Sequence, residues 1–391
     1  MKVLVLAEHN IFEQSNAAAN RQRSLLENLE KSGNQIFHFS EVESSLVQQR
    51  SGLANRFSQI FTLLKELAGR YSRKKELYNF IDKIEPEIIW LAGDYVSTRC
   101  LLAKHDISRY CLFIEQSEFL DIHRIHKTNF LRTYLLDRKQ KYFENIVLRK
   151  LDGLALMTKK LMAHYSNNFP IQVPLLHLPM TVDLVRFVDP GTKPAELETP
   201  YISFTGFMNN IKDGVDILIA AFAKISDSFP DHKLYLIGPW QPDSIGHENQ
   251  IKSLNLQDRV FWLGTYPREA IPGILKNSDL LVLARPNSKQ AEGGFPTKLG
   301  EYLASSVPVC ATSVGEIPDY LEDEKTVFFA EPDSIDSFSN AMKRALSNKQ
   351  LAAQVGAHGR LVAEREFNAE IQSQKLHEYF EKTIEIKNHK K

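Results

Sequence analysis

Two glycines and two carboxylates lie close together in one short segment of this chain. Gly293 and Gly294 follow an apolar run, residues 279–284, that has the composition of a buried parallel strand and is followed by a helical pattern. Bare backbone amides at a strand-to-helix crossing, beside a helix N-terminus, predict an anion site. Glu292 and Glu301 flank the glycines, and carboxylates accept hydrogen bonds from the vicinal hydroxyls of a sugar or ribose. The segment therefore predicts a ligand that carries both phosphate and sugar.

The helix that follows the glycines is expected to begin at Thr297, because apolar residues recur at helix spacing from there. Lys298 lies in the first turn, where its ammonium group would face the predicted anion. Pro296 removes one amide donor from the loop. Phe295 either packs the loop or contacts the ligand, and the sequence leaves both interpretations open.

The bulk properties are those of an intracellular enzyme. A chain of 391 residues suits two domains, and 43% hydrophobic with 25% charged residues is normal for a globular protein. Three widely spaced cysteines argue against a disulfide framework and against a zinc site. The N-terminus becomes polar too soon for a signal peptide, and no apolar stretch approaches the roughly 20 residues of a membrane span. We therefore expect a cytoplasmic protein.

The net charge is zero overall but uneven along the chain. Residues 1–187 carry six more basic than acidic side chains, and the remainder carries six fewer. Basic residues cluster in two helical segments, 65–75 and 138–150. These segments are either ordinary solvated helix faces or a basic amphipathic surface that docks on an anionic membrane. Neither half is basic enough to predict binding of nucleic acid.

Strand-like and helix-like segments alternate throughout, which predicts an α/β protein with parallel sheets wrapped by helices. In the first half the expected strands are 3–7, 88–92, 111–114, 153–156 and 173–178, and the expected helices are 17–31, 57–84 and 130–149. In the second half the expected strands are 201–205, 233–237, 260–263, 280–283, 307–311 and 327–329, and the expected helices are 215–224, 268–276, 297–304 and 335–346.

A polar segment with two prolines and one glycine, residues 188–199, has the composition of a linker. We therefore expect a first domain at 1–187 and a second domain at 200–366. A last helix is expected at about 369–384, within the end segment 367–391.

The segment 291–304 resembles the donor-binding loop of retaining glycosyltransferases with the GT-B fold, the large family 4 group, in which seven residues separate two glutamates. Here eight residues separate Glu292 from Glu301, and Gly293 holds the strict position of the first glutamate. The resemblance extends along nearly the whole chain, through the segments 178–187, 201–219, 234–238, 260–267 and 308–320. It implies two Rossmann-like, doubly wound domains that face a central cleft, with the final helix crossing back onto the first domain.

The resemblance also implies which cations bind the diphosphate of a nucleotide sugar. Lys212 matches the lysine that stabilises the leaving diphosphate in this family, where aimed cations act best in a dry, preformed site. Phe207 stands where the family has an arginine. We expect Lys298 to supply the missing positive charge.

For the rest of the donor, the resemblance implies that Glu301 binds the ribose hydroxyls and that Tyr266 lies where the family holds the nucleobase. Tyr266 is equally well explained as a core residue. A one-residue insertion would let Glu292 act as the catalytic carboxylate that contacts the sugar. The expected donor-binding residues are Gly293, Gly294, Phe295, Thr297, Lys298, Glu301 and Tyr266.

The first domain is expected to hold the acceptor. Asn16 lies in a small-residue loop after the first strand that resembles the family's loop beneath the donor phosphates, and Arg21 lies on the helix that follows. Glu118 follows another strand end, and either Glu118 or His123 is expected to contact the transferred sugar. For each of these residues an ordinary structural or solvated role is the alternative interpretation.

The sequence has no Asp-x-Asp pair after a strand and no histidine cluster with ligand spacing, so we expect metal-independent transfer with no cofactor besides the donor. We expect a retaining transferase that moves a sugar to a hydroxyl of a surface polysaccharide or a lipid-linked saccharide. The alternatives are a GT-B phosphorylase, a nucleotide-sugar epimerase, and a non-catalytic partner protein with a degenerate donor site.

Overall fold

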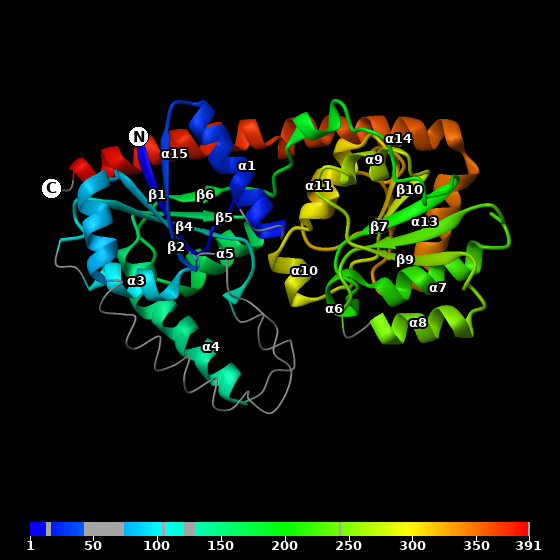
Figure 1. Cartoon of the computed structure of the whole chain (residues 1–391), viewed down its shortest axis with the longest axis horizontal. Helices are drawn as coiled ribbons and strands as arrows, with labels where there is room; N and C mark the ends of the chain where they lie inside the picture. The colour runs from blue at the N-terminus through cyan, green and yellow to red at the C-terminus, as the bar shows by residue number, and fades with distance from the viewer. Residues whose placement is uncertain (13–16, 43–73, 104–105, 121–129, 242–243, 390–391) are drawn as a thin grey trace.

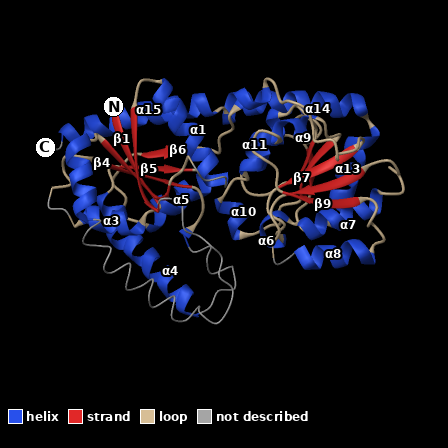
Figure 2. Ribbon diagram, in the orientation of Figure 1, coloured by secondary structure: helices blue, strands red, loops and turns tan. Residues whose placement is uncertain are grey.

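The computed structural model describes residues 1–12, 17–42, 74–103, 106–120, 130–241 and 244–389. These residues form two parallel six-stranded sheets with helices packed around each (Figures 1 and 2). The strand order is β2-β1-β3-β4-β5-β6 in the first sheet and β12-β11-β10-β7-β8-β9 in the second. In each sheet the direction of strand addition reverses beside the first strand, and ligands of doubly wound proteins bind at such points. The expected two-domain GT-B fold class is confirmed.

The strands of the first sheet are β1 (Lys2–His9), β2 (Gln35–Val42), β3 (Ile88–Ala92), β4 (Cys111–Gln116), β5 (Gly153–Leu156) and β6 (Leu175–His177). The strands of the second sheet are β7 (Tyr201–Thr205), β8 (Lys233–Ile237), β9 (Val260–Gly264), β10 (Leu280–Leu283), β11 (Val309–Thr312) and β12 (Phe328–Ala330).

The described helices of the first half are α1 (Ala17–Lys31), α3 (Tyr95–Leu102), α4 (Phe130–Tyr142), the π-turn η2 (Phe143–Val147), the 3₁₀ turn η3 (Leu148–Lys150), α5 (Lys159–Asn168) and η4 (Leu184–Phe187). Those of the second half are α6 (Asn210–Asp213), α7 (Val215–Ile225), α8 (Ser244–Ser253), α9 (Ile271–Lys276), α10 (Lys289–Gly293), α11 (Thr297–Ala304), α12 (Ile317–Tyr320), α13 (Ile335–Ser347), α14 (Lys349–Val362), η5 (Ala363–Phe367) and α15 (Ala369–His389).

Several segments differ from the expectations for the first half, where neither α3 nor α5 was predicted. The strand β2 was not predicted, because an edge strand alternates polar with apolar residues and lacks the continuous apolar run of the buried strands. The single helix expected at 130–149 is α4 followed by the turns η2 and η3. Of the helix expected at 57–84, residues 74–84 are helical and 57–73 lie outside the described residues.

The last helix, α15, packs against the first sheet although it follows the second sheet in sequence. Figure 1 shows it in red above the first half of the molecule. The ring of Phe380 lies 4.8 Å from that of Phe113 on β4, and both are fully buried. The hydroxyl of Tyr379 accepts a hydrogen bond from the Leu154 amide at 2.8 Å. These contacts build one apolar cluster from residues more than 200 positions apart in the sequence.

The chain passes between the halves at two adjacent segments that are bonded to each other. The Val182 amide donates to the Phe367 carbonyl at 2.8 Å, and the Ala369 amide donates to the Val182 carbonyl at 3.1 Å. The outgoing and returning connections therefore form one short parallel bridge.

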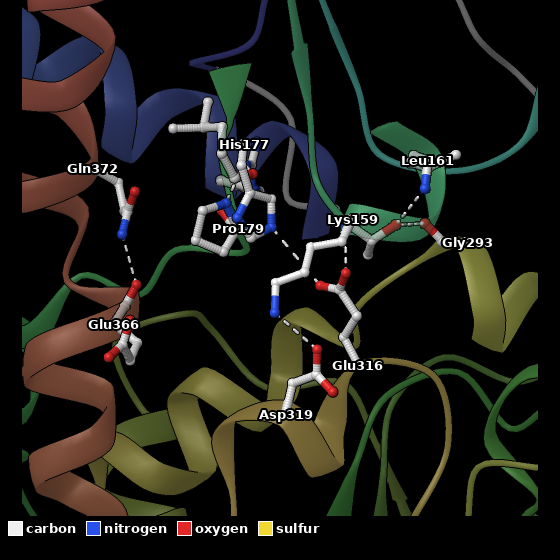
Figure 3. Close-up of polar contacts among 12 residues, drawn as sticks. Lys159, Leu161, His177, Pro179, Gly293, Glu316, Asp319, Glu366 and Gln372 are labelled. Carbon is white, nitrogen blue, oxygen red and sulfur yellow. Dashed lines mark hydrogen bonds and ion pairs between the residues drawn. The ribbon is translucent and has the colours of Figure 1, made fainter. Parts of the chain in front are cut away.

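The start of α5 makes a direct contact from the first half to the second (Figure 3). Thr158, the N-cap of α5, donates its hydroxyl to the Gly293 carbonyl at 3.0 Å. The Lys159 amide donates to the Glu316 carboxylate, and the Lys159 ammonium pairs with Asp319 at 2.9 Å. A carboxylate at a helix N-terminus is favoured by the helix dipole, so the Glu316 contact holds its own segment against the first half, and the Thr158 hydroxyl holds the 293 turn there.

Within the described residues, no helix combines the length and apolar composition needed to cross a bilayer.

We predict that Phe380→Ala lowers the free energy of unfolding by about 3–5 kcal/mol, because it empties a fully buried aromatic position. Urea denaturation followed by circular dichroism measures the change. The control is Ile371→Ala on the same helix, where the side chain is 39% exposed and a loss below about 1 kcal/mol is expected. Equal losses in the two variants would contradict the packing of α15 on the first sheet.

Candidate active site

A cavity of about 600 Å³ lies between the two halves of the molecule. Its wall is formed by residues at the carboxyl ends of β4, β7, β8, β9 and β10, by one side of α1 and by the start of α11. A volume of this size accommodates a small organic ligand. The predicted site residues that line it are Arg21, Glu118, Lys212, Tyr266, Phe295, Thr297, Lys298 and Glu301.

The start of α11 is the part of the expected anion site that lines the cavity. Pro296 is the N-cap residue and no side chain caps the helix, so the first amides of α11 have no side-chain acceptor. Thr297 and Lys298 occupy these first positions and line the cavity. Uncapped amides together with the helix dipole favour a negatively charged ligand here.

The two glycines lie beside this site, outside the cavity wall, which corrects the expectation that their own amides face the ligand. Gly293 ends α10, and the Gly294 amide already donates to the Gln290 carbonyl at 3.0 Å. A Cβ atom on Gly293 would lie 2.3 Å from the ring of Phe119, and one on Gly294 would lie 3.3 Å from the Cγ of Glu118. The glycines therefore permit close contact between the two halves.

Glu292 also lies outside the cavity wall. Its carboxylate is half exposed and faces Lys160 of the first half at 3.9 Å. Gln290, two residues earlier on the same short helix, is 3% exposed and points inward. Side chains two positions apart on a helix face different directions, so Glu292 and Gln290 lie on different sides of α10. Glu292 thus lies away from the position that was expected for it at the sugar, and the Gln290 side-chain amide donates a hydrogen bond to Glu118 at 3.2 Å.

Lys298 and Asp213 form a buried ion pair at the base of the cavity. The Lys298 ammonium lies 2.6 Å from the Asp213 carboxylate, and Asp213 is 1% exposed. Burial lowers the pKa of Lys298 below its ordinary value of 10.5, and the nearby Asp213 carboxylate opposes this shift. A Cβ atom on Gly206 would lie 2.1 Å from the lysine Nζ, so the pair requires glycine at that turn. Lys298 is thus held against the end of β7, beside the expected arginine position.

Arg285 is a cavity residue that the sequence analysis missed. It follows β10, is 2% exposed, and donates to the Gln290 carbonyl at 2.9 Å. Burial lowers the pKa of its guanidinium. Its positive charge also helps to lower the pKa of Lys298, as does Lys212, so the three cations lie near one another. No local sequence pattern distinguishes Arg285 from an ordinary residue at a strand end.

Lys212 faces the first half across the cavity. Its ammonium lies 3.1 Å from the carboxylate of Glu118, and both side chains are partly exposed. Asn209 caps the short helix α6, and its side-chain oxygen accepts a hydrogen bond from the Lys212 amide at 2.8 Å. This bond sets the direction of the lysine. The structure thereby brings together two predicted site residues from different halves.

Glu301, one turn into α11, is hydrogen-bonded through Oε1 to the guanidinium of Arg186, which precedes the linker.

Tyr266 lines the cavity, and its hydroxyl donates to Glu196 of the linker at 2.7 Å. Burial raises the pKa of Tyr266 to about 12, and the hydrogen bond to Glu196 adds to this shift. Phe207 is 45% exposed at the cavity wall.

On the side of the first half, Arg21 has a structural role beside the cavity. Its guanidinium pairs with Glu115 and donates to the carbonyls of Leu178 and Pro179, both at 2.8 Å. Burial lowers the pKa of Arg21, although the Glu115 carboxylate opposes this. The solvated role weighed for Arg21 is therefore wrong.

Asn16, expected in the preceding loop, and His123 lie outside the described residues.

A second cavity of about 390 Å³ lies next to the first and shares Gln22 and Glu115 with it. Its wall includes Leu136, Lys139 and Gln140 of α4. Among the described residues, no group of three or more His, Cys, Asp or Glu side chains has the arrangement of a metal site.

Comparison with known proteins finds a family match in the second half of the chain. Residues 193–362 match the family model described as glycosyl transferases group 1. The chain is 29% identical over 156 residues to N-acetyl-alpha-D-glucosaminyl L-malate synthase of Bacillus anthracis. This match covers 40% of this chain and 39% of that protein. It is 24% identical to a GDP-mannose-dependent monoacylated phosphatidylinositol monomannoside mannosyltransferase of Corynebacterium glutamicum, over 58% of this chain and 61% of the relative. The matches thus span less than two thirds of these relatives.

Solved structures share the fold over nearly the whole chain. Sucrose-phosphate synthase from Thermosynechococcus elongatus superposes with a TM-score of 0.73 at 18% identity, covering 97% of this chain and 98% of that one. The Anabaena protein HepE, solved in complex with UDP and glucose, superposes with a TM-score of 0.66 at 15% identity, covering 97% of this chain and 98% of that one.

We predict that Asp213→Asn costs about 3–5 kcal/mol of stability, because it leaves the Lys298 ammonium buried without its counter-ion. Lys298 binds its proton more tightly in the unfolded protein than in the folded one, so the free energy of unfolding rises with pH. The rise is steeper in the variant, because Asp213 no longer opposes the lowering of the lysine pKa. The difference from the unsubstituted protein should therefore shrink as the pH approaches 10.5. Glu292→Gln, at an exposed pair, is the control and should change stability by less than about 1 kcal/mol. Urea unfolding at several pH values measures both, and a pH-independent loss in Asp213→Asn would contradict the burial of a charged pair.

Proposed function

Because residues 193–362 belong to the glycosyl transferases group 1 family, we propose that this chain is a retaining glycosyltransferase that uses a nucleotide-diphosphate sugar. The observation that carries the proposal is the cavity wall. Within it, Lys212, Lys298 and Arg285 and the uncapped start of α11 lie on one side, and Glu301 lies one turn further along the helix. The cations and amides suit a diphosphate, and the carboxylate suits ribose hydroxyls.

In the proposed reaction the bond from the anomeric carbon to the β-phosphate oxygen breaks, and a bond to the acceptor hydroxyl oxygen forms. The proton of that hydroxyl passes to an oxygen of the departing diphosphate. Negative charge then develops on the departing diphosphate. Lys212 stabilises this charge after exchanging its partner Glu118 for a phosphate oxygen. Lys298 and Arg285, held in a drier part of the site, supply positive charge that needs no rearrangement. With these cations we propose that the transfer needs no divalent metal and no cofactor, and retention follows from the family resemblance.

Glu118 is well placed to release Lys212 and then contact the transferred sugar, because it also lies within reach of the Gln290 amide. Donor binding would therefore replace a contact between the halves by contacts to the ligand. Movement at the connecting segments would accompany this exchange. Glu292 is half exposed and lies opposite Lys160, outside the cavity wall. The carboxylate that we propose for the sugar side of the cavity is therefore Glu118.

A donor screen by calorimetry tests this proposal. We expect one class of nucleotide diphosphate, among UDP, GDP and ADP and their sugars, to bind. Glu301→Ala should weaken that binding at least about ten-fold through loss of charge-assisted hydrogen bonds. Lys212→Ala should lower turnover by about 10²–10³-fold while the nucleotide still binds. Lys325→Ala, at an exposed surface pair, is the control and should change neither quantity.

The same screen separates the alternatives. A protein that binds no nucleotide would be a non-catalytic member of the fold, a hypothesis that the phenylalanine at position 207 and the glycine at position 293 keep open. Phosphate-dependent sugar release would indicate a phosphorylase, and isomerised donor without acceptor would indicate an epimerase. Activity that chelators abolish would contradict metal independence.

For the acceptor, we propose a saccharide, and a lipid-linked one is favoured by the surface of α4. The exposed residues of α4, η2 and η3 include Tyr134, Leu135, Ile146 and the cations Arg138, Lys139, Lys141, Arg149 and Lys150. This helix extends away from the first sheet, at the lower left of Figure 1. Exposed cations with apolar side chains among them favour an anionic membrane surface, at about 1 kcal/mol for each cation near the lipid. The second cavity opens beneath the same helix and adjoins the donor cavity, which would admit an acceptor from that side.

We predict that the protein sediments with phosphatidylglycerol vesicles and not with phosphatidylcholine vesicles. The double substitution Arg138→Glu and Lys141→Glu should reduce the bound fraction at least about ten-fold, because it reverses two charges on the exposed face. Lys252→Glu with Lys325→Glu, in the second half, is the matched control and should leave sedimentation unchanged. Equal binding by both double variants would contradict α4 as the docking face. Of the first basic cluster, residues 65–73 lie outside the described residues.

A further inference from the structure

Arg186 holds together two parts of the cavity that belong to different elements. One terminal nitrogen of its guanidinium bonds the Oε1 atom of Glu301 on α11, and the other donates to the Arg268 carbonyl at 2.6 Å. Arg268 lies in the loop after β9, two residues beyond Tyr266, and all four residues line the same cavity. The planar guanidinium therefore spans the two walls that would enclose a nucleoside.

The way in which Arg186 engages Glu301 leaves part of the carboxylate available. Among the described residues no hydrogen bond reaches Oε2 of Glu301, and the side chain is 29% exposed. Arg186 itself is 14% exposed, so this bond is better shielded from water than a surface ion pair. A carboxylate held at one oxygen by a fixed donor can present its other oxygen to a ligand hydroxyl in one orientation.

The position of Arg186 in the chain connects this contact to the boundary between the halves. It lies on η4, whose N-cap is Asp183, immediately after the bridge that joins Val182 to the returning chain. Upstream, the Leu178 and Pro179 carbonyls are bound by Arg21 of α1. The segment 178–186 is thus fixed at one end to the first half and at the other to the nucleoside side of the second half.

Resting on the proposed function, we infer that Arg186 is a positioning residue for recognition of the ribose. It orients the Glu301 carboxylate toward the ribose hydroxyls and sets the separation between α11 and the 266–268 loop. The protein should consequently prefer ribonucleotides over nucleotides that lack those hydroxyls, and this preference should depend on Arg186. The residue does not contact the reacting atoms.

The test measures the affinity of UDP, GDP and their 2′,3′-dideoxy forms by calorimetry. The unsubstituted protein should bind the better ribonucleotide at least about ten-fold more tightly than its dideoxy form. Arg186→Gln should reduce that ratio about ten-fold and leave the dideoxy affinity nearly unchanged. Arg186→Lys keeps the charge but cannot span both acceptors, so it should restore only part of the ratio.

A double-mutant cycle shows whether Arg186 acts through Glu301. In a Glu301→Ala background, Arg186→Gln should have no further effect on the ratio, because the carboxylate it orients is absent. Arg365→Gln is the control, since Arg365 pairs with Glu366 outside the cavity.

Three results would overturn the inference, and they differ in what else they reject. If Arg186→Gln weakens the binding of the ribo and dideoxy forms equally, Arg186 has a general structural role. If the effects in the double-mutant cycle are additive, Arg186 acts independently of Glu301. Either result leaves the proposed function standing. Failure of the unsubstituted protein to bind any of the four nucleotides would reject the proposed donor class together with the inference.

Discussion

The buried ion pair between Lys298 and Asp213 holds together the segments that form the base of the cavity. It joins the start of α11 to the end of α6, and it lies against the turn at Gly206, where a larger residue would collide with the ammonium. Burying two charges costs desolvation free energy, and the attraction between them offsets this cost only when they lie close together. The same pair places a cation beside uncapped helix amides, so the interaction that orders the site also determines its electrostatic character.

Several cations of the cavity wall have a carboxylate or carbonyl partner within the protein. Lys212 pairs with Glu118, Arg186 with Glu301, and Arg285 donates to a backbone carbonyl. Partners of this kind hold the side chains in defined positions, which reduces the conformational entropy lost when a ligand binds. Two of these contacts involve residues on opposite sides of the boundary between the halves, so ligand binding and the arrangement of the halves are linked in one set of interactions.

The glycines at positions 293 and 294 show how one pattern can have two physical causes. A glycine between strand and helix indicates close approach of some other group to the backbone. In this structure that group is Phe119 and Glu118 of the first half, and the Thr158 hydroxyl bonds the Gly293 carbonyl. The uncapped amides at the start of α11 follow within a few residues of these glycines. The partner of the glycines could not be predicted, since it comes from a segment more than 130 residues away.

The sequence alone determined the alternation of strands and helices, the position of α11 and the GT-B fold class, because these depend on local periodicity and on motifs within a few tens of residues. It also pointed to Lys212 and Glu301 through the family motif, and to Lys298 through its place at the start of the helix. Tertiary structure decided everything that depends on side-chain direction and on long-range packing. The burial of Arg21 against Glu115, the inward position of Gln290 in place of Glu292, and the roles of Arg285 and Arg186 all arise from contacts between distant segments. No local pattern records such contacts, because the sequence specifies which residues can pair and only the folded chain specifies which of them meet.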